Sequence, residues 1–148
     1  MVRNLIKKIL VALDGSSWAV HALDFALELA QQCSAEIQLI TVVPPLFLPM
    51  HSMNWASFGL MEINSPSENF LVALLDMAEE KARQEKTELK VSAKIEYGIP
   101  QEKIVETATK GHFDLIVMGK RGLGMKFTIG SVSCKVAEDA CCPVLIVK

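Results

Sequence analysis

The sequence predicts an α/β protein with an open, doubly wound, five-stranded parallel sheet and helices on both faces. Short apolar runs alternate with amphipathic helical patterns along its 148 residues, as in repeated strand-helix units. Two of these runs, Ile9–Leu13 and Leu115–Met118, are apolar throughout, as in strands that are covered on both faces. A glycine-rich loop, Gly119–Ser133, joins the second of these runs to a helical pattern.

The composition fits one domain over residues 1–148 and excludes some partners. Hydrophobic residues make up 51% of the chain, and the net charge of −2 is evenly spread, without the basic patch that nucleic acid or an anionic membrane requires. No apolar run approaches the roughly 18 residues that a spanning helix needs. We expect the four cysteines to be small, buried, reduced thiols of a cytoplasmic protein, although vicinal Cys141-Cys142 could oxidise or bind a soft metal.

The first half predicts a strand, a helix and a strand. Ile9–Leu13 ends at Asp14-Gly15-Ser16-Ser17, where a serine hydroxyl can cap a helix. Small apolar residues then recur at helical spacing: Ala19, Ala22, Leu23, Ala26 and Ala30. The second strand, Ala35–Val43, completes a right-handed parallel unit.

Residues 44–64 form a long loop insertion between the second strand and the second helix. Loops of this length usually act as a lid, bind a partner or lack order. The second helix is expected to begin at Ser65-Pro66-Ser67-Glu68, which resembles a capping box.

The second half supplies the other three strands. Residues 89–97 alternate between apolar and polar side chains, which indicates an edge strand with one face in water. Gly98-Ile99-Pro100 starts a short helix before the strand that ends at Met118. The last helix is expected from a helical pattern that contains Val132, Val136, Ala137 and Ala140. Pro143–Val147 is the fifth strand, whose open edge favours a symmetric dimer.

The glycine-rich loop is a candidate phosphate cradle. Gly119, Gly122 and Gly124 let backbone approach a ligand, and Gly130-Ser131 opens a helix whose first N–H groups favour an anion. In doubly wound sheets a ligand lies beyond the carboxyl ends of the strands where the strand order reverses. If the first and fourth strands are central neighbours, Asp14 and Gly119 bound that crevice.

The chain resembles the universal stress protein family over essentially its whole length. Three pieces in this order carry the resemblance: residues 9–16, residues 114–119, and Gly130-Ser131-Val132-Ser133 through to residues 142–147. The resemblance implies a Rossmann-like sheet of the adenine nucleotide alpha hydrolase type, a cytoplasmic homodimer through Val144–Val147, and bound ATP or AMP, with or without Mg²⁺.

The resemblance also implies which residues bind the nucleotide. Ala12, Asp14 and Val42 would line the adenine and ribose end, with Met118 closing the pocket. The ribose and phosphates would contact Gly119, Gly122, Gly130, Ser131 and Val132, with a hydroxyl added by Ser133. From the residues alone, Asp14 could instead be a turn residue that caps the first helix.

The glycine loop departs from the pattern of the ATP-binding branch. That pattern is Gly-x2-Gly-x9-Gly-Ser/Thr, whereas seven residues separate Gly122 from Gly130. A shorter loop could form a tighter cradle, select AMP or lose binding, and the retained glycines and Ser131 favour binding. Two alternatives to a nucleotide-binding regulatory protein remain: a dimeric docking protein that uses residues 44–64 without nucleotide, and a weak ATPase. No catalytic residue is assigned.

Overall fold

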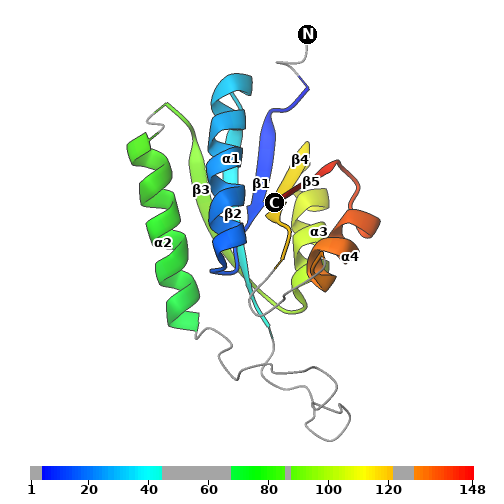
Figure 1. Cartoon of the computed structure of the whole chain (residues 1–148). Helices are drawn as coiled ribbons and strands as arrows, with labels where there is room; N and C mark the ends of the chain where they lie inside the picture. Colours follow the sequence, from blue (N-terminus) through cyan, green and yellow to red (C-terminus); the bar gives the residue numbers. More distant parts are fainter. Residues whose placement is uncertain (1–4, 45–67, 86–87, 122–128) are drawn as a thin grey trace, which may run out of the picture.

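The computed structural model describes residues 5–44, 68–85, 88–121 and 129–148 (Figure 1). Five strands alternate with four helices along the chain, as the sequence predicted. The first elements are β1 (Lys8–Ala12), α1 (Ser17–Cys33), β2 (Glu36–Val43) and α2 (Glu68–Glu85). The remaining elements are β3 (Val91–Tyr97), α3 (Pro100–Lys110), β4 (Leu115–Gly119), α4 (Ser131–Asp139) and β5 (Val144–Val147).

The strands form one parallel sheet in the order β3-β2-β1-β4-β5. β1 pairs with β2 through Ile9↔Ile37 and with β4 through Ile9↔Leu115. The central position of β1 and β4 and the edge position of β3 and β5 are therefore confirmed. Ile9, Leu10 and Val11 are fully buried, as expected of a strand covered on both faces.

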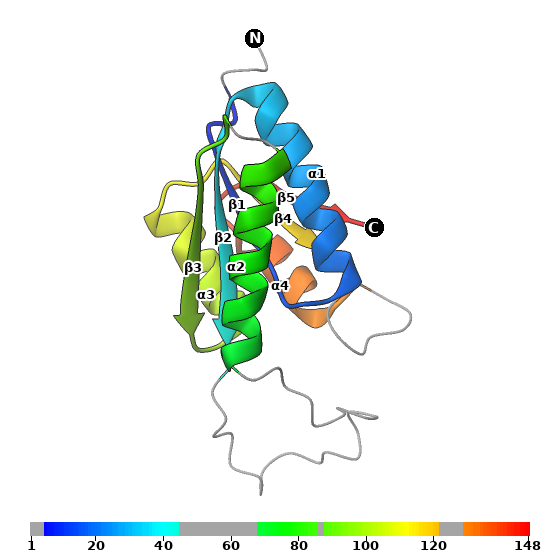
Figure 2. The same cartoon turned by 90° about the vertical axis from the view of Figure 1, so that its left-hand side faces the viewer.

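The helices cover the two faces of the sheet in pairs (Figure 2). α1 and α2 pack on one face, where the core includes Leu23, Leu27 and Leu75. α3 and α4 pack on the other face, where the core includes Ile104 and Val136. The two helices of each pair follow consecutive strands, so the chain changes face between α2 and α3.

The start of α1 follows the predicted chemistry. Ser16 is extended, and its hydroxyl accepts the N–H of Ala19 at 3.1 Å. The alanines of the predicted stripe face inward and let the helix approach the sheet closely. The proposed cap of α2 at Ser65 lies outside the described residues, as does the predicted loop over 44–64 apart from Pro44.

Only part of the expected burial is observed. Within the helical pattern of α4, Val136 is buried and Ala137 is exposed. All four cysteines are free thiols, but Cys134 and Cys141 are exposed. Cys141 lies against the Thr109 hydroxyl at 3.3 Å, whereas Cys142 is half-buried, and burial raises the pKa of its thiol.

Candidate functional site

The candidate site lies beyond the carboxyl ends of β1 and β4. These strands are hydrogen-bonded neighbours, and from them the chain proceeds to opposite sides of the sheet: from β1 to β2, and from β4 to β5. The strand order therefore reverses between them, which is where a doubly wound sheet opens a crevice. The β1–α1 turn and the start of α4 lie at this point.

Asp14 shapes the β1–α1 turn. Its Oδ1 accepts the N–H of Ser16 at 2.9 Å, and Gly15 between them has φ of 86°, a left-handed conformation suited to glycine. β2 also stabilises the turn, because Thr41 donates its hydroxyl to the carbonyl of Leu13 at 2.8 Å. The turn role considered for Asp14 is confirmed, whereas the cap of α1 is Ser16 and not Asp14. Its half-buried carboxylate remains a candidate ligand acceptor at the same place.

Gly119 is required by the close approach of α1 to β4. A Cβ on Gly119 would lie 2.7 Å from both the carbonyl carbon and the Cβ of Trp18. The first turn of α1 thus rests directly on the end of β4. A larger residue would push apart the two elements that frame the crevice.

The two ends of the glycine loop are held together. Gly130 donates its N–H to the carbonyl of Lys120 at 2.9 Å, and Lys120 donates to the carbonyl of Val147 at 2.8 Å. Ser16 approaches the same neck, with its hydroxyl 3.4 Å from the carbonyl of Arg121. The loop therefore leaves and re-enters the fold beside the β1–α1 turn. Gly122, predicted to contact the ligand, lies outside the described residues.

Among the described residues, no side chain caps the start of α4. Gly130 is its N-cap residue and makes no side-chain hydrogen bond, in contrast to Ser16 at α1. Ser131 at the first helical position is exposed and Val132 is half-buried. The first N–H groups of an α-helix lack partners within the helix, so an uncapped start favours an anion.

Ser133 has a structural contact. Its side chain is buried, and its hydroxyl donates to the carbonyl of Gly119 at 2.9 Å. This bond ties the first turn of α4 to the end of β4. The hydroxyl proton is thereby directed at the protein backbone, so the predicted contact of Ser133 with a ligand would have to use an oxygen lone pair.

The predicted adenine-lining residues gather on one face of the sheet. Met118 belongs to the buried core between the sheet and α3 and α4. Ala12, Val42 and Val132 are partly buried against the same core. The structure therefore brings residues from three strands and a helix into one apolar wall below the uncapped start of α4.

Trp18 is a residue of the site that the sequence interpretation missed. The guanidinium of Arg121 lies over its indole ring at 5.2 Å from the centroid. Arg121 is thus held against α1. The one signal in the sequence was the aromatic side chain of Trp18, two residues after the cap Ser16.

Neither a metal-binding cluster nor a membrane-spanning helix is found among the described residues. Within ranges 5–44, 68–85, 88–121 and 129–148, histidine, cysteine and acidic side chains form no group of three or more that could hold a metal ion. Across the same ranges no helix has the length and apolar character to cross a membrane.

Comparison with known proteins decides the family. The model of the universal stress protein family matches residues 5–148. The chain belongs to the universal stress protein family. A universal stress protein from Methanocaldococcus jannaschii is 35% identical over 150 residues, covering 98% of this chain and 84% of the relative.

Solved structures of universal stress proteins share the fold. One from Lactobacillus plantarum superposes with a TM-score of 0.78 at 23% identity, covering 97% of this chain and 98% of the other. Another, solved in complex with cAMP, gives a TM-score of 0.74 at 25% identity, covering 98% and 99%. The five-stranded parallel sheet with four helices is therefore that of its family.

Proposed function

We propose that this universal stress protein binds an adenine nucleotide, ATP or AMP, at the β1–β4 crevice and acts as a regulatory protein in the stress response. One observation carries the proposal: an uncapped helix start and an acidic turn meet at the reversal of strand order. The similarity to a family member solved with cAMP supports an adenine ligand.

Each part of the ligand has a complementary part of the crevice. The base would lie against the apolar wall of Ala12, Val42 and Met118, and the carboxylate of Asp14 would accept ribose hydroxyls. The phosphates would lie at the start of α4, near Gly130 and Ser131. Mg²⁺, if it accompanies ATP, would be held chiefly by the phosphates.

Calorimetric titration with ATP, ADP, AMP and cAMP tests the proposal. We expect heat of binding from at least one of them and a higher melting temperature in its presence. If none produces heat or stabilisation, the proposal fails, and a docking protein that does not use nucleotide becomes the better interpretation.

Asp14→Asn separates ligand binding from folding. The amide keeps an oxygen for the N–H of Ser16 but replaces the other acceptor with a donor, so ribose hydroxyls lose their partner. We expect about 10- to 100-fold weaker binding, since a hydrogen bond to a charged group contributes about 1.5–3 kcal/mol. Asp76→Asn, on the exposed face of α2, is the matched control and should bind as the wild type does.

A weak ATPase is the second candidate function. Gly130→Trp would fill the phosphate end of the crevice, so hydrolysis by this site must disappear in that variant. Turnover that persists identifies a contaminating enzyme.

A regulatory role requires that the nucleotide bind two conformational states of the protein with different affinities. Pull-downs with and without nucleotide test this role, because a shift between the two states would change the set of bound partners.

We further propose a cytoplasmic homodimer through β5. Val144–Val147 forms an open edge of the sheet, and its four apolar side chains are all only half-buried. A second copy would cover them. The free thiols support a reducing compartment.

A further inference from the structure

A second concave surface lies on the face of α3, along β2 and β3. Two adjoining cavities of about 280 and 520 Å³ share Gln38, Gly111 and Phe113. We call them together the β3 groove. It runs from the amino ends of the strands, where Lys8 and Glu36 lie, to Glu96 and Lys103 near the carboxyl end of β3. None of its lining residues is among those assigned to the β1–β4 crevice.

The β3 groove exists because α3 does not reach the edge of the sheet. On the opposite face α2 covers β3, with Val91 and Ile95 packed against the core. On the α3 side the side chains of β3 remain at the groove: Ser92, Lys94 and Glu96. This polar face predicts contact with water or with a charged partner instead of an apolar one.

The β3 groove carries an excess of positive charge in an acidic protein. Five lysines and three glutamates line it, whereas the whole chain has a net charge of −2. The lysines are Lys8, Lys90, Lys94, Lys103 and Lys110, and the glutamates are Glu36, Glu96 and Glu106.

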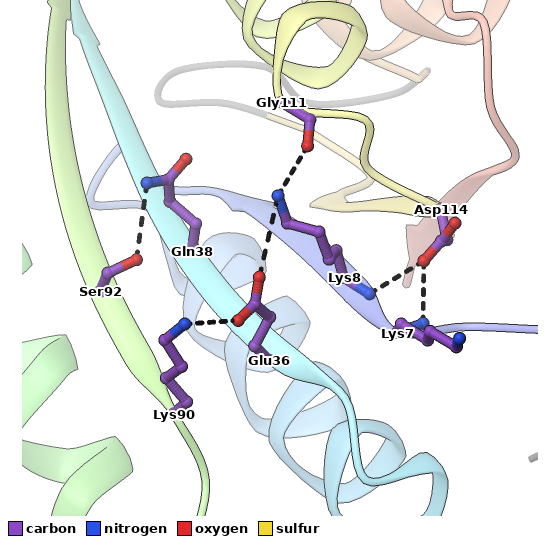
Figure 3. Close-up of polar contacts among 8 residues, drawn as sticks. All are labelled: Lys7, Lys8, Glu36, Gln38, Lys90, Ser92, Gly111 and Asp114. Carbon is purple, nitrogen blue, oxygen red and sulfur yellow. Dashed lines mark hydrogen bonds and ion pairs between the residues drawn. The ribbon is translucent and has the colours of Figure 1, made fainter. Parts of the chain in front are cut away.

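The lysines are held by ion pairs that an acidic ligand could replace. Figure 3 shows Glu36 between Lys90, at 2.9 Å, and Lys8, at 3.7 Å. The Lys90 side chain is 81% exposed. Such solvent-exposed pairs contribute only about 0.2–1 kcal/mol each, so exchanging a partner costs little.

The backbone of β3 has an open side next to this charge. Lys90 accepts the N–H of Ile37, and Gly98 donates to the carbonyl of Val43. Because backbone groups of a parallel strand point alternately to its two sides, even-numbered residues of β3 face β2. The N–H and C=O of Ala93 and Ile95 therefore point to the open edge, where the described sheet ends.

We propose that the β3 groove binds an acidic peptide in extended conformation, which adds as a strand to the open edge of β3. Side chains of an added strand alternate between faces. Acidic residues at every second position would all face the groove, within reach of Lys94 and Lys103. Lys94 at the edge would in turn disfavour basic partners.

A fluorescein-labelled peptide of alternating Glu and Thr, as long as β3, is the probe. We expect saturable binding to the full chain at low ionic strength, which weakens as salt is added, and no binding of the Lys-Thr counterpart. Lys94→Gln with Lys103→Gln should weaken binding about fivefold, because two exposed charge contacts are lost. Lys135→Gln, on α4, is the matched control and should have no effect.

Ala93→Pro tests the added strand itself. Proline at this position removes an N–H that points to the open edge but changes no charge and no hydrogen bond to β2. Edge strands tolerate proline when its missing N–H faces away from the sheet. We expect about tenfold weaker binding of the peptide, while inorganic tripolyphosphate, which needs only the lysines, binds the variant and the wild type alike. Ile146→Pro on the opposite edge should leave peptide binding intact.

Three results would overturn the proposal: no peptide binding by the wild type, equal binding by Ala93→Pro, or an Ala93→Pro variant that converts a wild-type dimer into a monomer. The last would show that β3 pairs with a second copy. Melting curves establish that each variant is folded. If Ala93→Pro unfolds, the double lysine variant decides the outcome, and unchanged binding there refutes the proposal.

Discussion

Gly119 lies where α1 and β4, the two elements that frame the crevice, are in close contact. Its missing side chain lets the backbone of Trp18 pack against β4. We expect Gly119→Ala to lower the free energy of unfolding by about 1–3 kcal/mol, as other overpacked sites do, because α1 must shift outward. Urea denaturation measures this change. A variant as stable as the wild type would show that α1 yields easily at this point.

The side chain of Ser133 links the start of α4 to the end of β4, the two elements that the glycine loop connects. Ser133→Ala leaves the carbonyl of Gly119 without its buried donor, so the expected loss of stability is about 1–3 kcal/mol. Ser131→Ala, two residues earlier on the exposed surface, should change stability by less than about 0.5 kcal/mol. Equal losses in urea denaturation would contradict the role given to Ser133.

At residue scale, the contacts of the candidate residues were harder to predict than the turns that hold them. Asp14 could be predicted at the crevice because a polar residue ended an apolar run, and its turn role was an open alternative. The buried task of Ser133 could not be predicted, because it depends on Gly119 being its neighbour across the fold. The pairing of Arg121 with Trp18 likewise exists only once α1 meets β4.

At the scale of elements, the two helices that start at the crevice differ in their caps. Ser16 supplies α1 with its own acceptor, whereas Gly130 supplies α4 with none. Glycine in place of serine at an N-cap costs a helix only roughly a few tenths of a kcal/mol. An anion at α4 would offset that deficit, so nucleotide binding and helix stability should rise together.

On α3, Glu106 accepts hydrogen bonds from Lys110 and Lys103, which lower the pKa of its carboxyl from about 4.5 to about 2. A carboxyl whose pKa is lower in the folded state stabilises the protein above its unfolded pKa. We therefore expect its contribution to be complete above about pH 4.5 and to disappear as the pH falls towards about 2.

Carbon-13 NMR titration of the Glu106 carboxyl measures this pKa directly. Lys110→Ala should raise it, since Lys110 has the largest influence, and Lys135→Ala on α4 should leave it unchanged. An ordinary pKa in the wild type would show that water screens these lysines fully.

Periodicity was sufficient to predict the type and order of the elements. The apolar runs Ile9–Leu13 and Leu115–Met118 became the neighbouring strands β1 and β4 inside the sheet, and the alternating run became the edge strand β3. The exposure of Tyr97 and Ala93 was not predictable, because alternation says which side chains share a face but not how far a helix extends over it. The exposure of Ala137 has the same cause.

At the scale of the whole molecule, the two edges of the sheet differ in chemistry. The groove side of β3 presents Lys94 and Glu96, whereas β5 presents valine, leucine and isoleucine. An apolar edge that is half-exposed favours self-association, and a charged edge opposes it. The two edges should therefore attract different partners: β5 a second copy of the chain, and β3 an acidic strand.

Ile146→Pro tests the role of β5. The carbonyl of Pro143 accepts the N–H of Ile116, and the carbonyl of Val147 accepts the N–H of Lys120. The backbone groups of odd-numbered residues of β5 therefore face β4. The N–H of Ile146 points to the open edge instead. Proline there blocks pairing with a second copy without removing a bond to β4. In sedimentation velocity at high micromolar concentration we expect a dimer for the wild type and for Ala93→Pro, and a monomer for Ile146→Pro. A wild-type monomer would refute the dimer, and a dimer that survives Ile146→Pro would place its interface elsewhere.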